Sequence, residues 1–112
     1  MSEDMHPSPA DLVRVEAKGD ATETAIIVEG ELDMSGATEF LARVREAIDT
    51  RQGSIAIDAR GLTYMDSSGL RSLLLARAAA DDAGVAFRIS EPSPALRHLI
   101  QRTGLQDLLL DE

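Results

Sequence analysis

Two adjacent hydroxyls and a carboxylate stand together in residues 64–70, which read Tyr-Met-Asp-Ser-Ser-Gly-Leu. The preceding residues 54–58 form an apolar run typical of a strand, and a segment with helical periodicity follows from Leu70. The sequence therefore predicts that Asp66, Ser67 and Ser68 lie at the amino end of a helix. Unpaired backbone N–H groups and the helix dipole favour an anion there, so the position suits a phosphoserine. Ser and Asp are also the ordinary capping residues of any helix.

A second short motif, Gly-Glu-Leu-Asp at residues 30–33, follows residues 25–28, which are typical of a strand. A segment with helical periodicity separates it from the Asp-Ser-Ser-Gly motif. In this order and spacing, the two motifs resemble those of the STAS domain family, and most closely its single-domain branch, the anti-sigma factor antagonists. The resemblance covers about residues 11–110. It implies an α/β fold in which a mixed β-sheet of about four to five strands has helices packed against it.

In the antagonists that this sequence resembles, the unmodified protein captures a serine-kinase anti-sigma factor and thereby frees a sigma factor. Phosphorylation by the same kinase, at the serine after the Asp, ends the capture. The matching serine is Ser67, and Ser68 stays open as an alternative because spacing does not separate two adjacent hydroxyls. A phosphatase is the expected second partner. Carried over by position, the partner-binding residues are Gly30, Glu31, Asp33, Ser35, Asp66, Ser68, Gly69 and Arg71.

Two side chains near the second motif keep two interpretations each. Arg71 follows Ser67 by about one helical turn, where it either pairs with a phosphate on Ser67 or is solvated. Tyr64 either fills the core or is exposed as an anchor for a partner.

Three other functions compete with this hypothesis. A hydrolase could be built on Ser67, Asp81 or Asp82, and His98. It would need a Gly two residues before the serine to allow the strained nucleophile turn, and the sequence has Met65 there. A receiver domain phosphorylated on an aspartate such as Asp58 would need an acidic pair after the first strand, which the sequence lacks. A STAS-type module without a phosphoswitch, which binds a ligand or belongs to a transporter, stays open because fold does not fix function. We therefore expect a binding protein and not an enzyme.

The composition limits the partners and cofactors. The net charge of −9, of which −7 falls in residues 1–56, repels nucleic acid and anionic membranes and favours a partner with basic groups. Cysteine is missing, and the two histidines, His6 and His98, are far apart in sequence, so we expect no metal site and no cofactor. Neither a long apolar run nor a secretory signal is apparent, and we therefore expect a cytoplasmic protein without a membrane partner.

The length of 112 residues suits one domain, which we place at residues 11–112 after a polar, flexible tail at 1–10. Within it, apolar patterning predicts strands at residues 12–15, 24–28, 55–57 and 85–89, and helices at about 36–50, 68–82 and 94–103. Ser35 is the expected cap of the first helix, and Ser93 and Gly104 are the expected ends of the third. Leu105 and the apolar run at residues 108–110 predict a last short strand.

Overall fold

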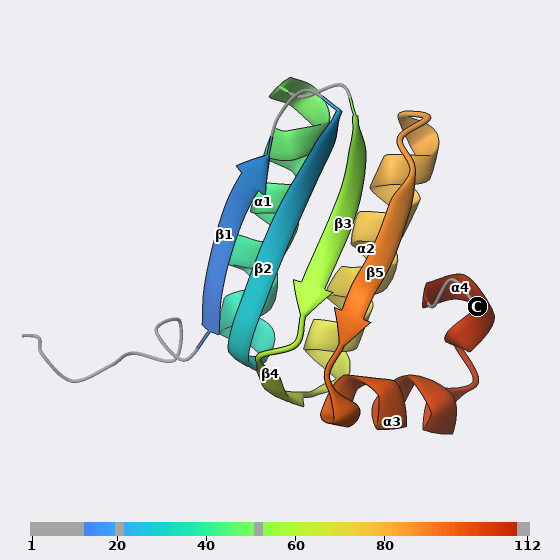
Figure 1. The fold of residues 1–112 in the computed structure, drawn as a ribbon. Helices are drawn as coiled ribbons and strands as arrows, with labels where there is room; N and C mark the ends of the chain where they lie inside the picture. Colours follow the sequence, from blue (N-terminus) through green and yellow to red (C-terminus); the bar gives the residue numbers. More distant parts are fainter. Residues whose placement is uncertain (1–12, 20–21, 51–52, 110–112) are drawn as a thin grey trace, which may run out of the picture.

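A computed structural model describes residues 13–19, 22–50 and 53–109, and the expected flexible tail at residues 1–10 lies outside this part (Figure 1). Five strands form one sheet: β1 (Val13–Gly19), β2 (Glu23–Leu32), β3 (Ser54–Ala59), β4 (Leu62–Met65) and β5 (Phe87–Pro92). Four helices accompany them: α1 (Met34–Thr50), α2 (Ser67–Asp82), α3 (Pro94–Thr103) and α4 (Gln106–Leu109). The prediction of an α/β fold with a mixed sheet is confirmed.

The sheet follows the order β1-β2-β3-β5, with β1 antiparallel to β2 and the other neighbours parallel. The short strand β4 also pairs with β2, in parallel, at residues 30–32. One edge of β2 therefore contacts β3 along its first half and β4 at its end. The carboxyl ends of β2 and β4 consequently lie side by side.

Both long helices cover the same face of the sheet (Figure 1). On β2, buried side chains alternate with partly buried ones, as expected for a strand with one face against a core. The buried residues of α1 and α2 recur mostly at intervals of three or four, which places them on one side of each helix. The core holds, among others, Ile26, Val28, Phe40, Val44, Ile57, Leu73 and Ala76, each at most 2% exposed.

The prediction of a strand at the carboxyl end is wrong, because residues 106–109 form the helix α4. Leu105 and Leu109 are spaced as in one helical turn, and the N–H of Leu109 donates to the carbonyl oxygen of Leu105 at 3.0 Å. This spacing lets Leu109 pack into the core while Leu105 packs against it. The strand expected from residue 85 begins instead at Phe87.

The third helix follows its expected boundaries. The Oγ of Ser93 accepts a hydrogen bond from the N–H of Leu96 at 3.1 Å, and Pro94 follows at the first helical position. Gly104 ends the helix in the left-handed conformation, with φ of 74°. Such a residue is commonly Gly, because other residues are strained there.

Candidate functional site

Two aspartates start the two long helices at neighbouring positions. Leu32, the last residue of β2, pairs with Met65, the last residue of β4. Asp33 follows β2, and α1 begins directly after it. Asp66 follows β4, and α2 begins directly after it. The two sequence motifs, far apart along the chain, therefore meet at one end of the sheet.

Each aspartate caps its own helix with its side chain. The Oδ1 atom of Asp66 accepts a hydrogen bond from the N–H of Gly69 at 3.0 Å. The Oδ1 atom of Asp33 accepts from the N–H groups of Ser35 at 3.0 Å and Gly36 at 3.2 Å. A carboxylate at this position satisfies donors that the first helical turn leaves unpaired and complements the helix dipole.

The expectation that Ser35 caps the first helix is therefore wrong. The strand β2 continues to Leu32, so Asp33 is the residue at the junction with α1, and Ser35 lies inside the helix, exposed. Gly30 and Glu31, which follow the strand predicted at residues 24–28, also belong to β2. The strand is irregular at this point, since its register with β4 shifts between Gly30 and Glu31 and Gly30 has φ of 96°.

The two turns share a local sequence pattern that identifies both caps. Residues 32–36 read Leu-Asp-Met-Ser-Gly and residues 65–69 read Met-Asp-Ser-Ser-Gly. In both, the Asp accepts from the N–H of the Gly three residues later, and that Gly is buried. By position, Ser67 corresponds to Met34, which is 73% exposed, and Ser68 corresponds to Ser35. This repeat is the sequence feature that would have located Asp33 as the cap.

The two candidate serines differ in exposure. Ser67 is exposed at the first position of α2, whereas Ser68 is partly buried and contributes to a groove between α1 and α2. Neither hydroxyl makes a hydrogen bond with the rest of the described chain. The carboxylate of Asp66, the residue before Ser67, accepts through Oδ1 from the N–H of Gly69 and makes no hydrogen bond with the Ser67 hydroxyl. The hydroxyl of Ser67 is thus accessible and has no hydrogen-bond partner among the described residues.

Gly69 sets the distance between α2 and the sheet. It is buried, and a Cβ atom added to it would overlap the carbonyl oxygen of Leu32 and lie 2.7 Å from Cγ of Met65. Real Cβ atoms do not approach other atoms so closely, so only a glycine permits this contact. The N–H of Asp66 adds a long hydrogen bond of 3.4 Å to the carbonyl oxygen of Leu32. The start of α2 is thereby held against the end of β2.

Charged and apolar side chains surround the two turns. Glu31 is exposed and lies opposite Tyr64 in the β2–β4 pairing. Tyr64 is 51% exposed, which excludes the core-filling interpretation of its side chain. Arg71 is exposed and makes no ion pair with the other described residues. It borders two hollows on the sides of α2, and both also include Ser68. Glu31, Ser68 and Arg71 belong to the predicted partner-binding set, and the exposure of Tyr64 agrees with its other interpretation, an exposed side chain.

The described residues contain no cluster of three or more His, Asp or Glu side chains suited to a metal ion. Within the same part of the chain, none of the helices has the length and apolar character needed to cross a membrane.

Comparison with known proteins assigns a family. A family model described as "Mlab, STAS domain" matches residues 15–111. No curated protein sequence matches the chain significantly.

Among solved structures, the anti-sigma factor antagonist SpoIIAA in its unphosphorylated form has a TM-score of 0.72 and 25% identity, over 89% of this chain and 87% of that chain. The phosphorylated form of the Bacillus cell fate determinant SpoIIAA has a TM-score of 0.67 and 25% identity, over 89% and 90%. An anti-sigma factor antagonist from Mycobacterium paratuberculosis has a TM-score of 0.71 and 22% identity, over 91% and 86%, which supports the fold.

Proposed function

The chain belongs to the STAS domain family, and from this membership we propose that it acts as an anti-sigma factor antagonist in the cytoplasm. In its unmodified form it binds a serine-kinase anti-sigma factor, and this capture frees a sigma factor. Phosphorylation of Ser67 by the same kinase ends the capture, and a phosphatase restores it. The observation that carries the proposal is the exposed, unengaged hydroxyl of Ser67 at the start of α2.

The geometry of the turn favours Ser67 over Ser68 as the acceptor. A kinase must bring the hydroxyl in line with the γ-phosphate of its nucleotide, so the hydroxyl has to be reachable from outside. Ser67 is exposed, and its counterpart in the first turn, Met34, is the most exposed large apolar side chain among the described residues. Ser68 is partly buried at the groove between the helices. The hydroxyl of Ser67 has no hydrogen-bond partner among the described residues, so the kinase supplies the general base.

The protein can accept a phosphate without refolding. A phosphate brings about −1.5 to −2 charges, and the unpaired N–H groups of the first turn of α2 favour an anion. Structures of SpoIIAA in its unphosphorylated and phosphorylated forms both match this fold, which is consistent with a switch that leaves the fold intact.

The binding partner therefore experiences the main effect of the phosphate. Two unit charges about 5 Å apart at an effective dielectric of about 20 interact by roughly 3 kcal/mol before salt screening. A phosphate opposite a carboxylate of the kinase would therefore weaken binding by about a hundredfold.

The proposed capture surface consists of the two turns and the strand ends that hold them. It comprises Gly30, Glu31, Asp33, Ser35, Asp66, Ser68, Gly69 and Arg71. Asp33, Asp66 and Gly69 shape this surface through the helix caps and the close contact with β2. Glu31 and Arg71, both exposed, present charge to the partner.

A phosphorylation assay tests the proposal. Purified wild type, Ser67→Ala and Ser68→Ala are incubated with ATP and each candidate anti-sigma factor kinase of the source organism, and the modified residue is mapped by mass spectrometry. We expect modification of the wild type and of Ser68→Ala, and none of Ser67→Ala, which still binds the kinase. Modification of Ser67→Ala at the wild-type rate would transfer the role to Ser68. Binding without modification by any kinase would favour a STAS module without a phosphoswitch.

A further inference from the structure

A groove of about 210 Å³ runs between α1 and α2 beside the proposed acceptor serine. Its walls include Met34 and Leu41 from α1 and Ser68, Arg71 and Leu75 from α2. Met34 is 73% exposed and Leu75 is 38% exposed, so two of the three large apolar side chains that the described residues expose border this groove. Apolar side chains concentrated at one exposed site indicate a surface that is covered by a partner.

The size of the groove indicates which kind of ligand fits. Pockets for cofactors and drug-sized ligands measure about 300–1,000 Å³ and enclose most of the ligand. A groove of 210 Å³ is smaller than these and suits one or two inserted side chains. A peptide segment of a protein partner meets this limit better than a nucleotide or another cofactor.

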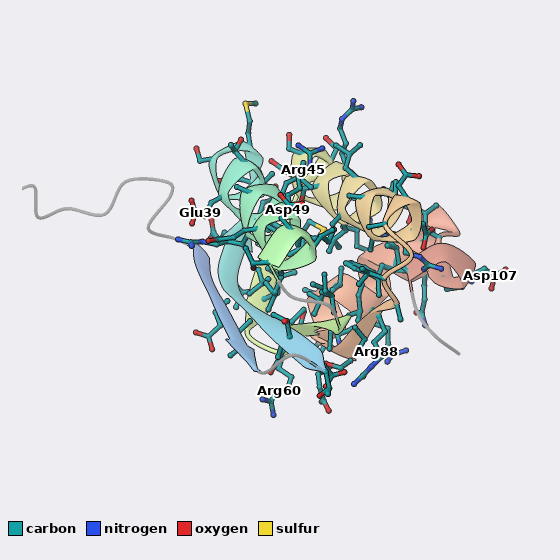
Figure 2. All side chains as sticks on the ribbon, turned by 90° about the horizontal axis from the view of Figure 1, so that it is seen from above. Glu39, Arg45, Asp49, Arg60, Arg88 and Asp107 are labelled. Carbon is teal, nitrogen blue, oxygen red and sulfur yellow. The ribbon has the colours of Figure 1, made fainter. Side chains whose placement is uncertain are left out.

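The charge of the groove indicates the chemistry of that segment. The chain carries a net charge of −9, yet the charged residue that lines the groove is Arg71. Arg45 extends the same side of α1, since Met34, Thr38, Leu41 and Arg45 are spaced by four, three and four residues. Figure 2 shows Arg45 on the side of α1 that faces α2, whereas Glu39 lies on the opposite side. Neither arginine has an ion pair with another described residue.

Building on the proposed function, we propose that this groove binds an acidic amphipathic segment of the kinase partner. One apolar side chain of that segment inserts between Met34 and Leu75. A carboxylate next to it pairs with Arg71, which presents a planar guanidinium suited to such a contact. The groove thus provides an anchor that is separate from the acceptor hydroxyl.

The groove and the exposed carboxylate of Glu31, near the end of β2, together fix the orientation of the partner. Unlike Arg71, Glu31 does not line the groove. Glu31 favours a basic group, whereas Arg71 favours an acidic one. A partner with the opposite arrangement of charges docks in one register, and the reversed register places like charges together. This register brings the active site of the kinase to Ser67.

Two substitutions at one groove position isolate the charge requirement. Leu75→Glu and Leu75→Lys remove the same apolar contact but introduce opposite charges, and the partial exposure of Leu75 allows both to fold. We expect Leu75→Glu to raise the dissociation constant for the kinase by about tenfold or more, and Leu75→Lys to bind at least tenfold more tightly than Leu75→Glu. Calorimetric titration with a kinase that modifies Ser67 of the wild type measures both.

A second pair of variants tests Arg71 itself. Arg71→Glu should weaken binding about tenfold or more, while Arg102→Glu, an equal charge change on the exposed end of α3, should leave it nearly unchanged. A photoreactive amino acid at position 34 should cross-link to an acidic, apolar segment of the kinase.

The outcomes separate this inference from the proposed function. Wild-type affinity of Leu75→Glu and Arg71→Glu, with Ser67 still phosphorylated, would overturn the groove while the antagonist function stands. A cross-link from position 34 to a second copy of this chain would overturn it as well and assign the groove to self-association. If every candidate kinase fails to bind the wild type, both proposals are wrong.

Discussion

Asp66 caps α2 with its carboxylate, so the two serines that follow it are not required to hold the helix start. Asp66→Ala leaves the N–H of Gly69 without its acceptor, and we expect the free energy of unfolding to fall by about 1 kcal/mol. Asp66→Asn should stay within a few tenths of a kcal/mol of wild type, because Asn and Asp cap about equally. Urea unfolding at neutral pH measures all three proteins. Equal stability of the Ala and Asn variants would contradict the cap.

The ion pair between Arg60 and Asp58 makes the free energy of unfolding depend on pH in the acid range. The guanidinium of Arg60 donates to the carboxylate of Asp58 at 3.1 Å and 2.9 Å, and these hydrogen bonds hold the pKa of Asp58 below its ordinary value, against the smaller opposing effect of partial burial. In the unfolded chain that pKa returns to about 3.9. The stabilisation is therefore complete above about pH 4 and is lost as the pH falls through the lowered pKa of the folded state.

We expect Asp58→Asn to remove part of the fall in melting temperature below about pH 4, because an amide does not titrate there. Arg60→Gln should show the same flattening, since the lowered pKa requires both partners. Thermal unfolding followed from about pH 2.5 to pH 6 measures the effect. A wild-type slope in both variants would assign the acid sensitivity to other carboxylates.

Among the elements, Gly69 controls how closely α2 approaches β2. Gly69→Ala places a Cβ atom against the Leu32 carbonyl oxygen and Met65, so the first turn of α2 must move away from the strand. We expect a loss of about 1–3 kcal/mol, the usual effect of overpacking. Ser68→Ala, one residue earlier on the same turn, is the control and should cost a few tenths. Thermal unfolding followed by circular dichroism compares them, and a neutral Gly69→Ala would mean that the contact relaxes at no cost.

Elements with a clear apolar pattern were predictable from the sequence, including the short strand β3, whereas β4 and α4 were not. The stripe of α1 and the Ser93 and Gly104 boundaries of α3 follow from periodicity and end signals. The strand β4 has only four residues, with buried Leu62 and Met65 at its ends and no alternation between them, so its pairing with β2 decides its structure. In α4, packing of Leu109 into the core overrides the strand-like composition.

The candidate site was predicted in part for the same reason. Asp66, Ser67 and Gly69 follow from a local pattern at the start of a helix. Their closeness to Glu31 and Asp33 depends on the pairing of β2 with β4, which no local pattern reveals. The resemblance to the family implied that these residues act together, although local patterns did not show it. The cap of α1 was assigned to Ser35 instead of Asp33.

For the molecule as a whole, the uneven negative charge should guide the encounter with a basic region of the partner. Glu31→Lys reverses an exposed charge at the proposed capture surface, so we expect association with the kinase to slow several-fold and to depend less on salt. Glu46→Lys is the matched control, because it makes the same charge change at an exposed residue of α1 outside the proposed capture surface. Glu46 accepts a hydrogen bond from Arg43 on the same helix. Stopped-flow association rates over a range of ionic strength compare the two. A normal rate for Glu31→Lys with abolished binding of Glu46→Lys would place the interface elsewhere.

The start of α2 is held by Asp66, and the hydroxyl of Ser67 makes no bond within the described chain. A modification of that hydroxyl should therefore leave the unfolded population, and with it the exposure to cellular proteases, almost unchanged. Both forms would then share one lifetime. With the proposed phosphoswitch, the total amount of the protein would stay constant while its modified fraction varies, so a stimulus would be stored as a ratio that can be reset many times without new synthesis.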